Sequence, residues 1–139
     1  MKRLHALSLI FVLTLLAACA PAAGRPTIPY LAQSSEVIGT IAQVGPQLRP
    51  GGAYNFLGIE TIGDNFITLV ADKRPDSQIL GNFTGSANTV SLTVTTIQNG
   101  EVTQVATSGV PRDNSIVNRT LDTIIQELDA RFERAPQAQ

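Results

Sequence analysis

The sequence predicts an α+β domain, in which a four- or five-stranded antiparallel meander carries a short N-terminal helix and a long C-terminal helix on one face. Three observations lead to this fold class. Runs rich in Val, Ile and Thr are separated by turn residues, as in antiparallel sheets. The dipeptide Asn99-Gly100 joins two of these runs as a hairpin. Apolar residues then recur at helical spacing between Ser115 and Arg134, and this stripe needs a sheet face to cover it.

The first predicted helix begins at Ser35 and ends near Val44. Serines that can cap the helix precede its apolar positions, and Glu36 lies in its first turn. The apolar positions are Val37, Ile38, Ile41, Val44 and Leu48. Because several of these residues are β-branched and Gly39 interrupts them, a strand over residues 37–44 remains an open alternative. Residues 49–52, Arg-Pro-Gly-Gly, are predicted as a loop.

Five runs are predicted as strands: residues 54–62, 66–71, 78–84, 89–97 and 102–108. A two-residue turn at Asn99-Gly100 would place Ile97 opposite Val102 and Thr96 opposite Thr103. One face of this hairpin then carries Val90, Leu92, Val94 and Val105, and the other carries Thr93, Thr95, Gln104 and Ala106. The pattern indicates a sheet with one buried and one solvated face.

The long C-terminal helix is predicted from Ser115 to Arg134. Its apolar stripe consists of Val117, Leu121, Ile124, Ile125, Leu128 and Phe132. Arg119, Asp122, Gln126, Asp129 and Glu133 lie largely off that stripe. Asp113 and Asn114 are alternative caps at its start.

The first residues have the order of a secretory signal peptide. Lys2 and Arg3 precede an uncharged apolar run over residues 6–16, which is too short to span a bilayer comfortably. The run leads into Leu16-Ala17-Ala18-Cys19, which resembles the lipobox of bacterial lipoproteins. The resemblance implies cleavage between Ala18 and Cys19 and a diacylglyceryl group on the Cys19 thiol. Each buried methylene contributes about 0.8 kcal/mol, so two or three chains on one residue would hold a domain at a bilayer.

These segments predict the domain organisation. Residues 1–18 are read as a lipoprotein signal peptide, 19–33 as a tether rich in Pro, Ala and Gly, 34–135 as one α+β domain and 136–139 as a disordered tail. The expected location is the cell envelope, through lipid on Cys19. Ala20 is not the aspartate of an inner-membrane retention signal, which favours the outer membrane in a cell with two membranes. In a cell with one membrane, the domain would occupy the outer face of the plasma membrane.

The composition of the mature chain argues against several functions. Removal of residues 1–18 leaves 121 residues with 8 basic and 11 acidic side chains and no histidine. This balance gives no field that would attract nucleic acid. Without histidine, the commonest general base and metal ligand, we expect no enzyme, no cofactor and no metal site. The spacing of Glu60, Asp64, Asp72 and Asp76 fits no calcium loop, so solvated turn residues are expected. The aromatic residues Tyr30, Tyr54, Phe56, Phe66 and Phe83 are expected in the core, with a ligand groove as the alternative.

The predicted order of elements is similar to domains of small bacterial envelope lipoproteins, including the lipoprotein subunit of the outer-membrane protein assembly machinery. The shared element is a hairpin like residues 90–108 followed by a helix like residues 116–132. A second similarity, to lipoproteins that assist curli or flagellar assembly, rests on a comparable Asn-Gly hairpin.

The leading hypothesis for function is a non-catalytic, lipid-anchored scaffold or adaptor for a protein partner, bound for example by strand addition at a sheet edge. The alternatives are a small-ligand or lipid binder and an accessory lipoprotein of an export or surface-appendage assembly system.

Overall fold

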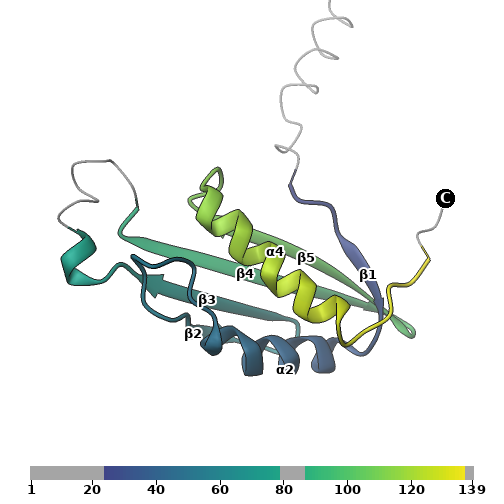
Figure 1. Cartoon of the computed structure of the whole chain (residues 1–139). Coiled ribbons are helices and arrows are strands. Elements are labelled where there is room, and N and C mark those ends of the chain that lie inside the picture. The colour runs from purple at the N-terminus through teal and green to yellow at the C-terminus, as the bar shows by residue number, and fades with distance from the viewer. Residues whose placement is uncertain (1–23, 79–86, 137–139) are drawn as a thin grey trace, which may run out of the picture.

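Five antiparallel strands form one sheet in the computed structural model, which describes residues 24–78 and 87–136 (Figure 1). The strands are β1 (Ile28–Leu31), β2 (Gly58–Ile62), β3 (Phe66–Asp72), β4 (Thr89–Asn99) and β5 (Val102–Val110). Their spatial order is β1-β5-β4-β3-β2, so β2 to β5 form a meander and β1 joins at the β5 edge. The helices are α2 (Ser34–Val44) and α4 (Ser115–Asp129), and a short 3-10 helix, η1 (Gly45–Gln47), follows α2. The predicted α+β class is confirmed.

Both helices cover the same face of the sheet, and the core lies between the two layers (Figure 1). Side chains of β3, β4 and β5 alternate between buried and more accessible positions. The predicted buried face is confirmed, with Val90, Leu92, Val94 and Val105 at most 1% exposed. The helix α4 packs on the sheet through its predicted apolar stripe. Five stripe residues are buried: Val117, Leu121, Ile124, Ile125 and Leu128.

Residues 34–44 form a helix, which excludes the strand that the β-branched residues left open. Five of its residues are buried, including Val37 and Ile41. The backbone N–H of Gln33 donates to the Glu36 carboxylate at 2.8 Å, and this bond satisfies one of the amides left free around the first turn. Glu36 therefore contributes to the start of α2.

The predicted register of the β4–β5 hairpin is wrong by two residues. Asn99 lies opposite Val102, and Ile97 lies opposite Gln104. The turn therefore consists of Gly100 and Glu101, and Gly100 has a φ of 64°. Hairpins also favour a two-residue turn in which glycine comes first and only the first φ is positive. This turn forms here instead of the predicted Asn-Gly turn. Because side chains alternate with a period of two, a shift of two residues leaves each one on its predicted face.

The strand β1 corrects the predicted tether. Residues 28–31 were assigned to the tether over residues 19–33, but Ile28 lies opposite Val105 and Leu31 opposite Val102 in the sheet. Pro29 is tolerated because β1 is an edge strand. The outer side of β1 is closed by the C-terminal segment, since the Leu31 N–H donates to the Glu133 carbonyl at 2.8 Å and the Ala135 N–H donates to the Pro29 carbonyl at 2.9 Å.

Two of the predicted strands differ most from the structure. β2 begins at Gly58 rather than residue 54, and Tyr54 makes only an isolated bridge to Lys73. Of the strand predicted over residues 78–84, Gln78 is helical, together with residues 75–77, and the remainder lies outside the described residues. The fifth strand of the sheet is thus β1.

Asn114, and not Asp113, caps α4. Its side-chain oxygen accepts hydrogen bonds from the backbone N–H groups of Ile116 at 2.9 Å and Val117 at 3.2 Å. The helix ends at Asp129, five residues before the predicted end at Arg134. Phe132, beyond that end, still packs edge-on against Tyr30, with 6.4 Å between ring centroids.

We expect Asn114→Ala to lower the free energy of unfolding by about 1 kcal/mol, since two amides would lose their acceptor. Asp113→Ala is the matched control, because Asp113 is exposed and does not cap the helix. Urea denaturation followed by circular dichroism measures both variants. Equal losses in the two would show that Asn114 does not act as the cap.

Candidate functional site

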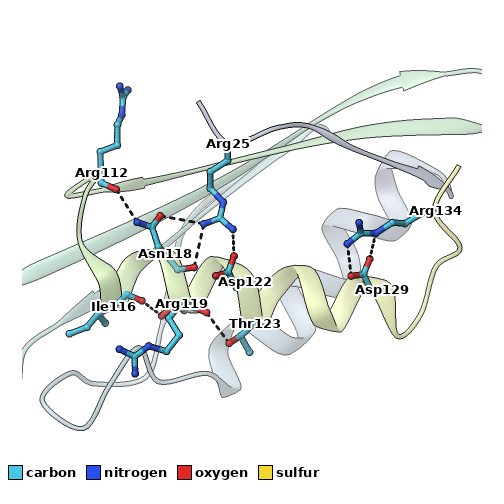
Figure 2. A network of polar contacts seen from close by, with 10 residues as sticks. Arg25, Arg112, Ile116, Asn118, Arg119, Asp122, Thr123, Asp129 and Arg134 are labelled. Carbon is cyan, nitrogen blue, oxygen red and sulfur yellow. Dashed lines mark hydrogen bonds and ion pairs between the residues drawn. The ribbon is translucent and has the colours of Figure 1, made fainter. Parts of the chain in front are cut away.

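The predicted site residues Ala18 and Cys19 lie outside the described part of the chain. The first described residue is Gly24, and only five residues separate Cys19 from Arg25. The candidate site is therefore the place where the segment that follows Cys19 meets the folded domain. Arg25 makes that contact, on the first half of α4 (Figure 2).

The guanidinium of Arg25 binds two residues of α4. One nitrogen, Nη1, donates to the Asn118 side-chain oxygen at 3.3 Å and to the Asn118 carbonyl at 3.4 Å. The other, Nη2, forms an ion pair with Asp122. Asn118 and Asp122 are four residues apart and so share one side of the helix, where a single guanidinium can bind both.

Arg25 positions the chain more than it stabilises the fold. Its side chain is 30% exposed and that of Asp122 is 58% exposed. An ion pair this accessible contributes at most about 1 kcal/mol. Asn118 extends the network, since its side-chain nitrogen donates to the Arg112 carbonyl at 3.4 Å (Figure 2). The N-terminal segment, the loop before α4 and α4 itself are thereby joined.

An open cavity of about 250 Å³ lies beside this network. Arg25, Thr107, Gly109, Arg112, Asp113 and Asn118 are among its lining residues. It lies where the end of β5 meets the start of α4, outside the core that buried side chains fill. Small-molecule sites are typically about 300–1,000 Å³ and mostly apolar. The cavity therefore gives little support to the small-ligand hypothesis.

A second polar cluster fastens the C-terminal segment to β1 and α4. Arg134 donates from Nε and Nη2 to the two carboxylate oxygens of Asp129, both at 2.7 Å. The Tyr30 hydroxyl donates to the same carboxylate at 2.8 Å. Burial, together with the Asp129 carboxylate, raises the pKa of Tyr30 well above its usual value. Tyr30 therefore stays protonated as a hydrogen-bond donor, which favours a structural role for the cluster over acid–base chemistry.

The hydrogen bonds from Arg134 lower the pKa of Asp129, against the opposing effect of burial. A carboxyl with a lowered folded-state pKa stabilises the fold above its unfolded pKa of about 3.9, and the contribution is lost as the pH falls through the folded value. We therefore expect Asp129→Asn to be less stable than the parent at pH 7, and this deficit to shrink below about pH 4.

Urea denaturation across this pH range measures the effect. Glu133→Gln, an exposed carboxyl in the same segment, is the matched control and should not reproduce the change. A deficit for Asp129→Asn that does not change with pH would contradict the role assigned to the carboxylate charge.

The acidic residues singled out in the sequence are not brought together as a site. The Asp72 carboxylate accepts from the Thr89 hydroxyl at 2.7 Å, and Asp76 pairs with Arg74 at 3.5 Å. Within residues 24–78 and 87–136, no group of three or more His, Cys, Asp or Glu side chains could hold a metal ion.

The aromatic residues divide between core and surface. Tyr30 and Tyr54 are at most 1% exposed, as the core interpretation predicted, and Phe66 is half-buried. Phe56 is 54% exposed, and the Cζ atom of Arg49 lies over its ring, 4.4 Å from the ring centroid. The prediction that Phe56 lies in the core is therefore wrong. Phe83 lies outside the described residues.

The two edges of the sheet differ. The C-terminal segment covers β1, whereas β2 is exposed along all five residues and no strand of the described chain pairs with its outer side. Ile59 is 41% exposed and Ile62 is 52% exposed. Sequence reasoning anticipated a partner at an exposed edge but could not locate that edge, since strand order in space is not contained in the alternation of residues.

Among the described residues, no helix is long and apolar enough to cross a bilayer. No family model matches the chain, and comparison with curated proteins and with solved structures finds no significant match.

Proposed function

We propose that the chain is a lipid-anchored, non-catalytic domain of the cell envelope that acts as an adaptor for a protein partner. The observation that carries the proposal is the contrast between the two edges of the sheet, β1 and β2. Arg25 docks beside the β1 edge of the sheet, which the chain's own C-terminal segment closes. At the other edge, no strand of the described residues pairs with the outer side of β2. The lipobox-like residues 16–19 supply the anchor.

The distance between these two sides suits an adaptor. β1 and β2 are the first and last strands of the sheet, four interstrand steps apart. At about 4.8 Å per step, the open edge lies about 19 Å from the closed one. A partner bound at β2 therefore does not have to displace the N-terminal segment from α4.

A register shift in β2 places its two exposed isoleucines on the same face of the sheet. Ile59 lies opposite Leu69, and Ile62 lies opposite Ile67, with the register shift between Ile59 and Thr61. Leu69 and Ile67 both belong to the buried face. The extra residue in β2 therefore places Ile59 and Ile62 on the same side although they are three positions apart. An extended partner segment could bond to the backbone of β2 and pack against these two side chains.

The anchor is tested with Cys19→Ser. We expect this variant to lose lipid labelling completely and to remain an uncut precursor, since the thiol that accepts the lipid would be absent. Metabolic labelling with a radioactive fatty acid and the electrophoretic mobility of the chain measure the two effects. Ser8→Ala, a small change within the apolar run, is the control for export. Normal processing and labelling of Cys19→Ser would reject the anchor.

The partner surface is tested with Ile62→Lys, which places a charge on the open edge. Ile97→Lys is the matched control, because Ile97 is 65% exposed but lies on the central strand β4. A photo-crosslinker at Thr61 should yield a defined product in cells, and Ile62→Lys but not Ile97→Lys should abolish it. Failure to recover any protein product at Thr61 would reject the adaptor role.

A further inference from the structure

Charged side chains are distributed unequally along the long axis of the domain. One end, called here the α4-start end, comprises the start of α4, the C-terminal ends of β3 and β5 and the loops beside them. It has six basic and four acidic residues: Arg25, Arg49, Lys73, Arg74, Arg112 and Arg119, with Asp72, Asp76, Asp113 and Asp122.

The opposite end, called here the hairpin-turn end, comprises the β4–β5 turn, the start of α2 and the end of α4. It has six acidic and two basic residues: Glu36, Asp64, Glu101, Glu127, Asp129 and Glu133, with Arg131 and Arg134. The domain is therefore positive at one end and negative at the other, and the single remaining charge, Glu60, lies near the middle of β2.

The first described residues lie on the side of the domain nearer its positive end, over the first half of α4 (Figure 1). Gly24 and Arg25 line a cavity with Gly109 and Arg112, which lie beyond the middle of β5 and before α4. Six residue steps of about 3.6 Å connect Cys19 to Arg25, so at most about 22 Å separates these two residues. An anchor at Cys19 consequently keeps this end close to the lipid.

We propose that the domain is oriented on the bilayer, with its α4-start end against an anionic lipid surface and its hairpin-turn end directed away. The occupant of the α4-start end is the headgroup layer of the membrane to which Cys19 attaches the chain. This inference rests on the proposed lipid anchor and adds to it a defined orientation.

Electrostatics can discriminate between the ends because the domain is long relative to the range of the field. The surface potential of a membrane decays over a Debye length of about 8 Å at physiological ionic strength. β4 alone, with eleven residues at about 3.4 Å each, is about 37 Å long. When the α4-start end touches the headgroups, the carboxylates of the hairpin-turn end are beyond their field, whereas the reverse orientation would place these carboxylates against the anionic lipid.

Two arginines are placed to make the contact. Arg112 and Arg119 are both exposed, and Figure 2 shows their side chains pointing away from each other on either side of Asn118. Both residues belong to the α4-start end, so a lipid surface against that end would lie near both guanidinium groups. The docking of Arg25 on Asn118 and Asp122 holds the chain beside these two arginines.

The test uses the full-length lipidated protein, reconstituted into vesicles of phosphatidylcholine with or without phosphatidylglycerol and with nitroxide-labelled lipid as quencher. A fluorophore is attached through Ser115→Cys at the α4-start end or through Asn99→Cys at the hairpin-turn end. Both positions are exposed, and Cys19 is blocked by its lipid. In phosphatidylglycerol vesicles we expect quenching about threefold greater at position 115 than at 99, and a smaller difference at high salt.

The double variant Arg112→Glu with Arg119→Glu should remove the difference, and the control Arg131→Glu, at the other end, should retain it. Equal quenching at positions 115 and 99 in protein that floats with the vesicles would overturn the orientation and leave the anchor intact. A difference that survives the double variant or high salt would also overturn it. Chain that fails to float with any vesicle would instead reject the lipid anchor.

Discussion

Gly109→Ala is expected to lower the free energy of unfolding by about 3 kcal/mol, near the upper end of the cost of overpacking a core. A Cβ added at Gly109 would lie 2.1 Å from Cγ1 of Val117 and 3.3 Å from the Ser91 carbonyl oxygen. Val117 is fully buried, and its branched side chain has little rotamer freedom in a helix. The first turn of α4 would have to move away from β5.

Gly39→Ala is the matched control for this prediction. Nothing lies within 4 Å of the Cβ position at Gly39, which is within α2, so alanine should stabilise the helix by about 0.5–1 kcal/mol. Adding Val117→Ala to Gly109→Ala removes the clashing methyl group, and the pair should be less destabilised than the sum of the two single variants. Additive losses in urea denaturation would contradict the close approach of α4 to β5.

Ile124→Ala is expected to cost about 3–4 kcal/mol, because it leaves a cavity where α4 packs on the sheet. The Ile124 side chain is fully buried at the centre of the stripe. Gln126→Ala, two positions along the same helix and exposed, should change stability by no more than about 0.5 kcal/mol. Thermal and urea denaturation measure both variants. A small loss for Ile124→Ala would show that the interface between α4 and the sheet can collapse around the missing side chain.

Local periodicity explains which parts of the fold could be predicted from the sequence. The stripe from Val117 to Leu128 and the alternation in β4 depend on residues a few positions apart, so the helix and both faces of the hairpin could be anticipated. The hairpin register depends on which two residues form the turn. Asn99-Gly100 and Gly100-Glu101 are both plausible turns, and the second occurs.

The parts that could not be predicted depend on contacts between distant residues. β1 has only four residues, one of them Pro29, and its strand structure comes from pairing with β5 and with the C-terminal segment. Arg25 and Asp122 are 97 positions apart, and no pattern in the sequence connects them. The lipidation of Cys19 is a different kind of prediction, because it depends on a short motif and not on the fold. The open β2 edge follows only from the spatial order of the strands.

The pairing of β1 has a consequence for the order in which the domain folds. β1 is held on its outer side by Glu133 and Ala135, which are synthesised about a hundred residues later. The N-terminal region therefore cannot complete its native contacts while the rest of the chain is still emerging, and contacts this distant in sequence form slowly. A domain closed in this way completes its fold later than one closed by local contacts. Removal of the last few residues would therefore expose the outer side of β1 at the opposite end of the chain.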